Sequence, residues 1–314
     1  SLCLYFVVVQ DLCAERKSLK RIVWVMMGVA LIEALYGLIQ ALVPTLGVLW
    51  VDYIQAYMGD ARGTFINRPV LYNPYHHISQ QFLNLVSAID SVSTPMVKQA
   101  ARQNNFKAPA IEFTQPEIDA MQTRLRTDFR AIDGKKLILI YPGGGILPIR
   151  AWPRHYYSQV ASELIKKGYT VGIVGLATDK QVAAAILSDC NHPACIDLTG
   201  YTRSVRELML IFQFARLLIT NDGGPGQFAA LTPVPTIIFY GPETPDLYGP
   251  VDDKATLFYN PLPCSPCLTA YNHRNSPCDG DNLCLKQIPP QQVLKNALQI
   301  LEGGRSAEVK KTKE

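Results

Sequence analysis

The pattern of hydrophobic and polar positions changes near residue 68. Residues 22–43 are apolar except for Glu33 and Gln40, and a basic stretch at 16–21 precedes them. A helix of this length would measure about 33 Å, which spans the hydrocarbon core of a bilayer. Basic residues next to such a span favour its cytoplasmic side. The pattern therefore predicts a membrane-like helical segment over 1–68, with a buried helix of a soluble domain as the alternative.

After residue 68, short apolar runs alternate with amphipathic stretches of helical period. Such alternation is typical of an α/β fold with a parallel sheet and right-handed crossovers. Strands are expected at 137–141, 171–174 and 195–197, from 217 to Asp222, and after Pro235. Helices are expected at 114–129, 153–167, 178–188 and 204–215, the first opened by a capping box of Thr114 and Glu117 and the second stopped by Gly168.

Three glycine-rich loops follow the first, fourth and fifth of these strands. The carboxyl ends of parallel strands lie at one edge of a sheet, so we expect the loops to converge there. Backbone amides at the start of a helix attract phosphate, and arginine binds phosphate oxygens through two parallel hydrogen bonds. The candidate ligand residues are Gly143, Gly144, Gly145, Arg150, Asp179, Asp222, Gly223, Gly224, Gln227, Gly241, Glu243 and Thr244.

Each charged candidate also has a structural alternative. Asp222 could cap its own helix, Asp179 could be a solvated helix start, and Arg150 could be a surface charge. As ligand residues, Arg150 and the amides would hold a diphosphate, and Asp179 would accept a bond from a ribose hydroxyl.

Composition narrows the classes of function. In 314 residues the net charge is only +4, which is too small and dispersed for nucleic-acid binding. Eight cysteines are too sparse for a disulfide scaffold. Four of them, Cys264, Cys267, Cys278 and Cys284, share one loop, and the sequence leaves open whether they bind a structural zinc ion, form disulfides or stay free thiols. The polar residues 303–314 are expected to form a disordered tail.

Four ordered motifs together resemble glycosyltransferase family 9, the heptosyltransferases and related enzymes of lipopolysaccharide assembly. They are Pro-Gly-Gly-Gly…Arg-x-Trp-Pro at 142–153, Leu-Thr-Gly at 198–200, Asn-Asp-Gly-Gly-Pro-Gly-Gln-Phe-Ala at 221–229 and Phe-Tyr-Gly-Pro-Glu-Thr-Pro at 239–245. The resemblance covers about 69–302. It implies a GT-B fold, in which 135–302 is the Rossmann-like, nucleotide-sugar-binding domain, and an inverting transfer that uses no metal or other cofactor.

The same resemblance implies roles for single residues. Arg150 takes the place of the basic residue that meets the donor phosphate, Gly223 and Gly224 offer amides to the diphosphate, and Asp222 faces the sugar. Two positions depart from the family motif, because Gly223 replaces a hydroxyl residue and Gln227 replaces a histidine.

The acceptor half of the family pattern is mostly missing. Only 71–83 is similar to the end of an acceptor domain, so 69–134 is expected to be its helical remnant. Inverting transfer needs a general base. We identify no catalytic residue, and His76 and His77 are candidates by chemistry only.

The segment Gly59-Asp-Ala-Arg-Gly-Thr-Phe-Ile-Asn-Arg68 resembles a stretch of the membrane-embedded O-antigen ligase/polymerase family. Together the two resemblances imply a glycosyltransferase at the cytoplasmic face of the bacterial inner membrane. Its donor would be ADP-heptose or a similar nucleotide sugar, and its acceptor a lipid-linked glycan. The alternative is a nucleotide-sugar-binding module without transfer activity, from a truncated or fused chain.

Overall fold

The computed structural model describes residues 75–90, 109–132, 136–145, 147–269 and 276–303. The chain divides into a unit of 1–71 and 90–95 and a unit of 72–89 and 96–314, and nearly all described residues belong to the second. The predicted membrane-like segment, the motif at 59–68 and the polar tail lie outside the described residues, apart from Gly303. In the described part of the chain, no helix has the length and apolar character needed to span a bilayer.

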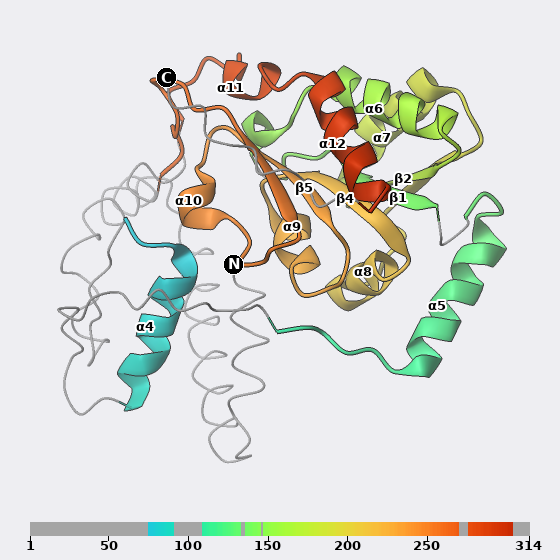
Figure 1. Cartoon of the computed structure of the whole chain (residues 1–314), viewed down its shortest axis with the longest axis horizontal. Helices are drawn as coiled ribbons and strands as arrows, with labels where there is room; N and C mark the ends of the chain where they lie inside the picture. The colour runs from blue at the N-terminus through green and yellow to red at the C-terminus, as the bar shows by residue number, and fades with distance from the viewer. Residues whose placement is uncertain (1–74, 91–108, 133–135, 146, 270–275, 304–314) are drawn as a thin grey trace, which may run out of the picture. The chain divides into compact units, whose positions relative to one another are not determined.

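Within the described residues, six parallel strands form one sheet in the order β3-β2-β1-β4-β5-β6 (Figure 1). Their bounds are β1 Leu137–Tyr141, β2 Thr170–Gly175, β3 Cys195–Thr199, β4 Ala215–Asn221, β5 Thr236–Tyr240 and β6 Ala255–Tyr259. The chain moves outward from β1 to β3 and then returns to the other side of β1 with β4. Ligands bind beyond the carboxyl ends of the strands at such a reversal. The five predicted strands and the Rossmann-like α/β class are confirmed, and β6 is an addition.

Both faces of the sheet are buried, because successive residues of a strand point to opposite sides. In β1, Ile138 and Ile140 join the core beneath helices α6 (Arg154–Lys166), α7 (Lys180–Cys190) and α12 (Pro290–Leu301). Leu137, Leu139 and Tyr141 join a second core beneath α5 (Gln115–Asp128), α8 (Val205–Phe212) and α9 (Gly224–Ala229). The fold is therefore a three-layer sandwich with one shared sheet (Figure 1).

Local signals place most of the helix boundaries. Glu117 accepts hydrogen bonds from the backbone nitrogen and the hydroxyl of Thr114, at 2.8 and 2.9 Å. Helix α5 begins directly after Thr114. Gly168 has a φ of 84°, the left-handed conformation that favours glycine after a helix. Helix α8 ends at Phe212, earlier than predicted, because Ala215 already pairs with Leu137 in the sheet.

Short elements complete the connections. They are α4 (Ile78–Asp90), the 3₁₀ turns η2 (Pro148–Arg150) and η3 (Ala177–Asp179), α10 (Pro245–Tyr248) and α11 (Leu283–Lys286). Turn η2 follows β1 and carries Arg150, and α10 follows the loop after β5.

Candidate functional site

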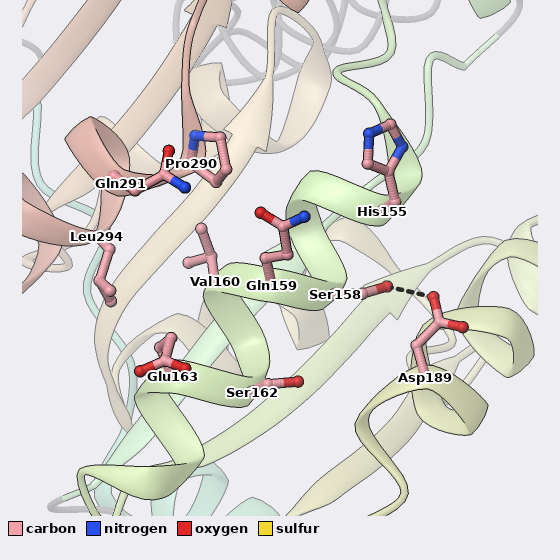
Figure 2. Close-up of a pocket in the computed structure, with 10 residues that line it drawn as sticks. All are labelled: His155, Ser158, Gln159, Val160, Ser162, Glu163, Asp189, Pro290, Gln291 and Leu294. Atoms are coloured by element: carbon pink, nitrogen blue, oxygen red, sulfur yellow. Dashed lines mark hydrogen bonds between the residues drawn. The ribbon is translucent and has the colours of Figure 1, made fainter.

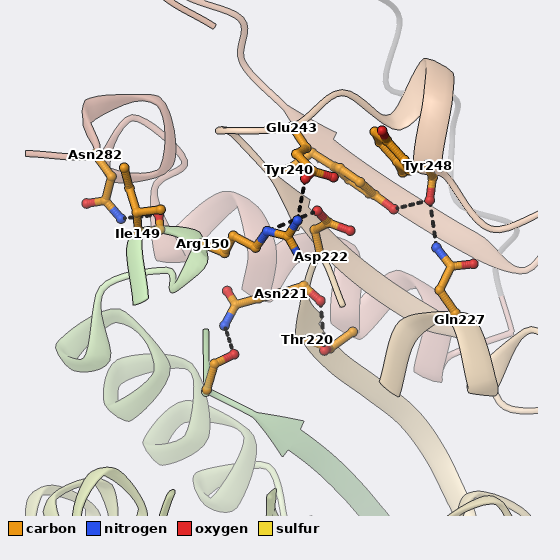
Figure 3. A network of polar contacts seen from close by, with 11 residues as sticks. Ile149, Arg150, Thr220, Asn221, Asp222, Gln227, Tyr240, Glu243, Tyr248 and Asn282 are labelled. Carbon is orange, nitrogen blue, oxygen red and sulfur yellow. Dashed lines mark hydrogen bonds and ion pairs between the residues drawn. The ribbon is translucent and has the colours of Figure 1, made fainter. Parts of the chain in front are cut away.

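The loops after β1, β4 and β5 converge, as the sequence predicts, and an ion-pair cluster joins them. The Arg150 guanidinium lies between two carboxylates: Nη2 donates to Glu243 Oε1, and Nε lies 3.8 Å from Asp222 Oδ2 (Figure 3). The Arg150 side chain is 12% exposed, and those of Asp222 and Glu243 are 9% and 3% exposed. Arg150 is therefore a partly buried member of the cluster and not a surface charge.

The Arg150 guanidinium retains an unused donor. Its Nε is buried and has no hydrogen-bond partner among the described residues. A buried donor without an acceptor costs about 1–3 kcal/mol, so a ligand oxygen at this position would be favourable. One guanidinium also faces two carboxylates, which makes the cluster net negative when all three groups are charged.

Asn221, the last residue of β4, connects three segments beneath this cluster. Its Oδ1 accepts from the backbone nitrogen of Trp152 and from the Tyr157 hydroxyl, both at 2.8 Å. Its Nδ2 donates to the carbonyls of Pro142 at 3.1 Å and Gly143 at 3.0 Å. Since Asn221 is fully buried, these bonds fix the loop after β1 and the segment that follows Arg150.

Two glycines after β1, Gly143 and Gly144, lie close to neighbouring atoms. A Cβ at Gly144 would lie 2.7 Å from the Leu147 carbonyl oxygen, and one at Gly143 would lie 2.8 Å from Asp179 Oδ1. The other oxygen of Asp179 accepts from the Leu176 backbone nitrogen at 2.8 Å. Asp179 therefore caps the turn after β2 and also borders the loop after β1, and its predicted contact with ribose stays a prediction.

The turn after β4 differs in detail from the expected phosphate loop. Gly223 is extended, with a φ of 165°, and a Cβ there would meet nothing within 4 Å. Helix α9, which follows, has only 6 residues. The Gln227 side-chain nitrogen donates to the Tyr248 carbonyl at 2.6 Å, and the Tyr240 hydroxyl donates to the same oxygen at 3.0 Å (Figure 3). Gln227 thus holds the end of α10.

Thr244 and Gly241 shape the loop after β5. The Thr244 hydroxyl accepts from the Asp246 backbone nitrogen at 3.3 Å and caps α10. A Cβ at Gly241 would lie 2.8 Å from the sulfur of Cys284, so glycine is needed for this close approach. Both residues hold the loop that carries Glu243, and no contact in the structure tests their predicted role as donor ligands.

Two tyrosines beside the site remain protonated at neutral pH. Burial, reinforced by the charges of Asp222 and Glu243, raises the pKa of Tyr240 far above its usual range. Burial and the charge of Asp179 raise the pKa of Tyr141 to about 12. Both phenols are therefore neutral groups that can donate a hydrogen bond.

His77 has a structural role in the described fold. One ring nitrogen, Nε2, donates to the Gly249 carbonyl at 2.8 Å, and the other, Nδ1, accepts from the Ser79 hydroxyl at 2.7 Å. This arrangement joins the residue before α4 to the residue that follows α10. Since both ring nitrogens are engaged, His77 is a poor candidate for the general base, and His76 stays a prediction.

None of the four loop cysteines forms a disulfide with another described residue. Cys264 and Cys278 are exposed, Cys267 is half-buried and Cys284 is buried, which raises the pKa of Cys284 to about 11. No cluster of three or more His, Cys, Asp or Glu side chains in the described residues is arranged to hold a metal ion. The structural zinc ion therefore stays a prediction from the cysteine spacing.

A separate cavity of about 640 Å³ lies along α6 (Figure 2). Its lining comes from α6, α12 and Asp189 at the end of α7, and it includes none of the candidate ligand residues. Ser158 donates to Asp189 at 2.7 Å, and Arg154 forms an ion pair with the same carboxylate. These polar groups bind one another and stabilise the contact between α6 and α7.

Three residues that support Arg150 were not among the sequence candidates. Besides Asn221, the indole of Trp152 donates to the Ile288 carbonyl at 3.1 Å and stacks on Phe239 at 4.5 Å. Asn282 contacts the turn that carries Arg150. Asn221 and Trp152 belong to the motifs at 221–229 and 142–153, so these motifs could have identified them as site residues. Asn282 stands in a loop without such a motif.

Comparisons with protein families and with curated proteins both identify heptosyltransferases as the similar proteins. The profile described as glycosyltransferase family 9 (heptosyltransferase) matches residues 57–276. Lipopolysaccharide heptosyltransferase 2 of Salmonella typhimurium is 28% identical over 180 residues, which are 56% of this chain and 49% of that protein. The Escherichia coli protein of the same description is 30% identical over 175 residues, 54% of this chain and 48% of its own length. The chain spans about half the length of these curated relatives.

Solved structures share the fold. The ADP-heptose lipopolysaccharide heptosyltransferase II of E. coli superposes with a TM-score of 0.61 at 21% identity, over 77% of this chain and 69% of that chain. A family 9 glycosyltransferase from Veillonella parvula superposes with a TM-score of 0.57 at 21% identity, over 75% and 63% of the two chains. At this level of identity the likeness concerns the fold alone.

Proposed function

The chain belongs to glycosyltransferase family 9, and on that premise we propose that it binds a nucleotide-sugar donor for transfer to a lipopolysaccharide-type acceptor. The relatives named above are heptosyltransferases, and the name of one solved relative includes ADP-heptose. We therefore take ADP-heptose, or a closely similar nucleotide sugar, as the donor. The acceptor is a lipid-linked glycan of the cell envelope.

The observation that carries this proposal is Arg150 at the reversal of strand order, with a buried Nε that makes no hydrogen bond to a described residue. A diphosphate offers several charged oxygens to a guanidinium, and charge-assisted hydrogen bonds of this kind are short and strong. Because Glu243 and Asp222 already flank Arg150, the donor has to compete with them. We infer that phosphate oxygens replace some of the carboxylate contacts of the Arg150 guanidinium. The carboxylates of Asp222 and Glu243 then accept hydrogen bonds from sugar hydroxyls.

The chemistry that follows is displacement at the anomeric carbon. The acceptor oxygen attacks the sugar while the bond to the diphosphate breaks, which inverts the anomeric configuration. Arg150 would stabilise the negative charge that develops on the leaving diphosphate, a contribution that grows as the bond breaks. The acceptor hydroxyl must also lose a proton to a base, and we assign that role to no described residue.

The proposed place of action is the cytoplasmic face of the inner membrane. A lipid-linked acceptor lies in that membrane, and a GT-B arrangement with a cleft between two domains would bring it to the donor. We keep a nucleotide-sugar-binding module without transfer as the alternative, and no feature of the described residues favours it.

Calorimetric titration of the full chain with ADP, UDP and GDP tests the donor site. We expect micromolar binding of ADP and at least a tenfold loss of it in the Arg150→Met variant, because the guanidinium that contacts the diphosphate is removed. We expect a loss of similar size in the Asp222→Ala variant when ADP-heptose is titrated, because an acceptor for a sugar hydroxyl is removed. Arg154→Met is the matched control, since Arg154 is 44% exposed and pairs with Asp189 outside the cluster. Binding that is unchanged in both cluster variants would contradict the site assignment, and a folded chain that binds no nucleotide would contradict the donor function.

A further inference from the structure

One segment of the chain contacts both loops that form the ion pair of Arg150 and Glu243. We call residues 262–288 the cysteine segment, of which 270–275 are not described. On the Glu243 side, the backbone nitrogens of Cys267 and Leu268 both donate to the Pro242 carbonyl at 2.9 Å. The Ser265 hydroxyl donates to the Gly241 carbonyl. The loop after β5 is therefore fixed at the two residues that precede Glu243.

On the Arg150 side, the contact is made by Asn282. Its Nδ2 donates to the Ile149 carbonyl at 3.1 Å (Figure 3). The same nitrogen donates to the Ala151 carbonyl at 2.9 Å. Both partners are acceptors, so the group that faces them must be the amide NH₂ and not the oxygen. Asn282 thus binds the backbone on both sides of Arg150 while its own side chain is half-buried.

We propose that Asn282 is a positioning residue for the donor diphosphate. It fixes the backbone of turn η2, so that the Arg150 guanidinium lies between Asp222 and Glu243. This inference rests on the proposed function of Arg150. A long arginine side chain loses considerable rotamer freedom when it binds, and a fixed backbone reduces that loss before the ligand arrives.

A double-mutant cycle on the full chain tests the inference, with ADP as the probe in calorimetry. Asn282→Ala should weaken ADP binding about tenfold, which corresponds to about 1.4 kcal/mol. In the Arg150→Met background the same substitution should have almost no further effect, since the guanidinium that it positions is absent. Asn282→Asp should weaken binding at least as much as Asn282→Ala, because a carboxylate would face two carbonyl oxygens.

Asn260→Ala is the matched control. Its side-chain amide also makes a hydrogen bond, to Gln287 Oε1 at 2.9 Å, but it is exposed and lies outside both loops. Equal losses from Asn282→Ala in the wild-type and Arg150→Met backgrounds would show a purely structural role and overturn the proposal. Unchanged ADP affinity in Asn282→Ala would overturn it as well.

Hydrogen exchange of the free protein provides a test that needs no ligand. The amides of 149–152 should exchange faster in Asn282→Ala than in the wild type, and should be unaffected in Asn260→Ala. If the wild-type chain binds no nucleotide, the proposed function fails, and this measurement still decides whether Asn282 fixes the turn. Unchanged exchange at 149–152 would overturn the positioning role.

Discussion

At the scale of single residues, the polar side chains of the site depend on one another. Asn221 is the clearest case, because its amide group makes four hydrogen bonds to three segments and is fully buried. Arg150 shows the complementary situation, since two carboxylates flank it while its Nε has no hydrogen bond. Asn221 thus fixes the backbone around the site, and Arg150 keeps one donor, its Nε, for a ligand.

Asn221→Ala should destabilise the protein by about 3–5 kcal/mol. It leaves the Pro142 and Gly143 carbonyls and the Trp152 nitrogen buried without their partner, and each unsatisfied group costs about 1–3 kcal/mol before relaxation. Urea unfolding measures the change. Asn260→Ala, which removes one exposed bond, should change the free energy of unfolding by less than about 0.5 kcal/mol. A loss below about 1 kcal/mol in Asn221→Ala would show that the four hydrogen bonds of Asn221 are unimportant for stability.

At the scale of elements, charged side chains attach α5 to α8. Arg206 Nε lies 2.8 Å from Glu117 Oε1, and Arg124 Nη2 lies 3.1 Å from Glu207 Oε2. The hydrogen bond from Arg206 lowers the pKa of Glu117 from 4.5 to about 2, and the hydrogen bond from Arg124 lowers the pKa of Glu207. These ion pairs add to the apolar contacts of Met121 and Leu125, so we expect α5 to be more sensitive to pH and salt than α12.

The attachment of α5 should weaken as the pH falls below about 4.5. A carboxylate whose pKa is lower in the folded state stabilises that state fully above its unfolded pKa of 4.5, and the contribution is lost as the pH falls towards 2. Hydrogen exchange at pH 5 and pH 3, corrected for intrinsic rates, should show a larger loss of protection in α5 than in α12. Molar salt should act in the same direction, because these pairs are largely exposed. Equal behaviour of both helices would contradict the prediction.

At the scale of the whole described unit, one parallel sheet serves two cores. Ile140 points to the layer of α6, α7 and α12, and Leu139 points to the layer of α5, α8 and α9. Both side chains are fully buried and are adjacent in β1, the strand at the centre of the reversal. The loops that carry the site are therefore supported from both faces of the sheet.

Ile140→Ala and Leu139→Ala should each lower the free energy of unfolding by about 2–5 kcal/mol. Because the two cores share β1, each variant should shift the same cooperative transition. Urea unfolding followed by far-UV circular dichroism and by tryptophan fluorescence should give coincident curves for both variants. A variant that separates the two curves would show that the layers unfold independently.

The sequence alone determined the elements and the places where ligand loops begin. The short apolar runs and glycine turns identify β1, β4 and β5, and the capping signals place α5 and the end of α6, because these features depend on neighbours a few residues away. The family resemblance also follows from the order of motifs along the chain. Asp222, Glu243 and Arg150 were recognised as candidates in this way, but without their mutual contacts.

Only the tertiary structure decided how these side chains are paired. Arg150 binds Glu243 from 93 residues away, and Asn282 reaches the Ala151 carbonyl across 131 residues. It also showed that the Gln227 side chain donates to the Tyr248 carbonyl and that His77 contacts the Gly249 carbonyl. The physical reason is that a hydrogen bond is satisfied by whichever group the sheet order brings within about 3 Å, and the order of strands is set by the packing of both faces together.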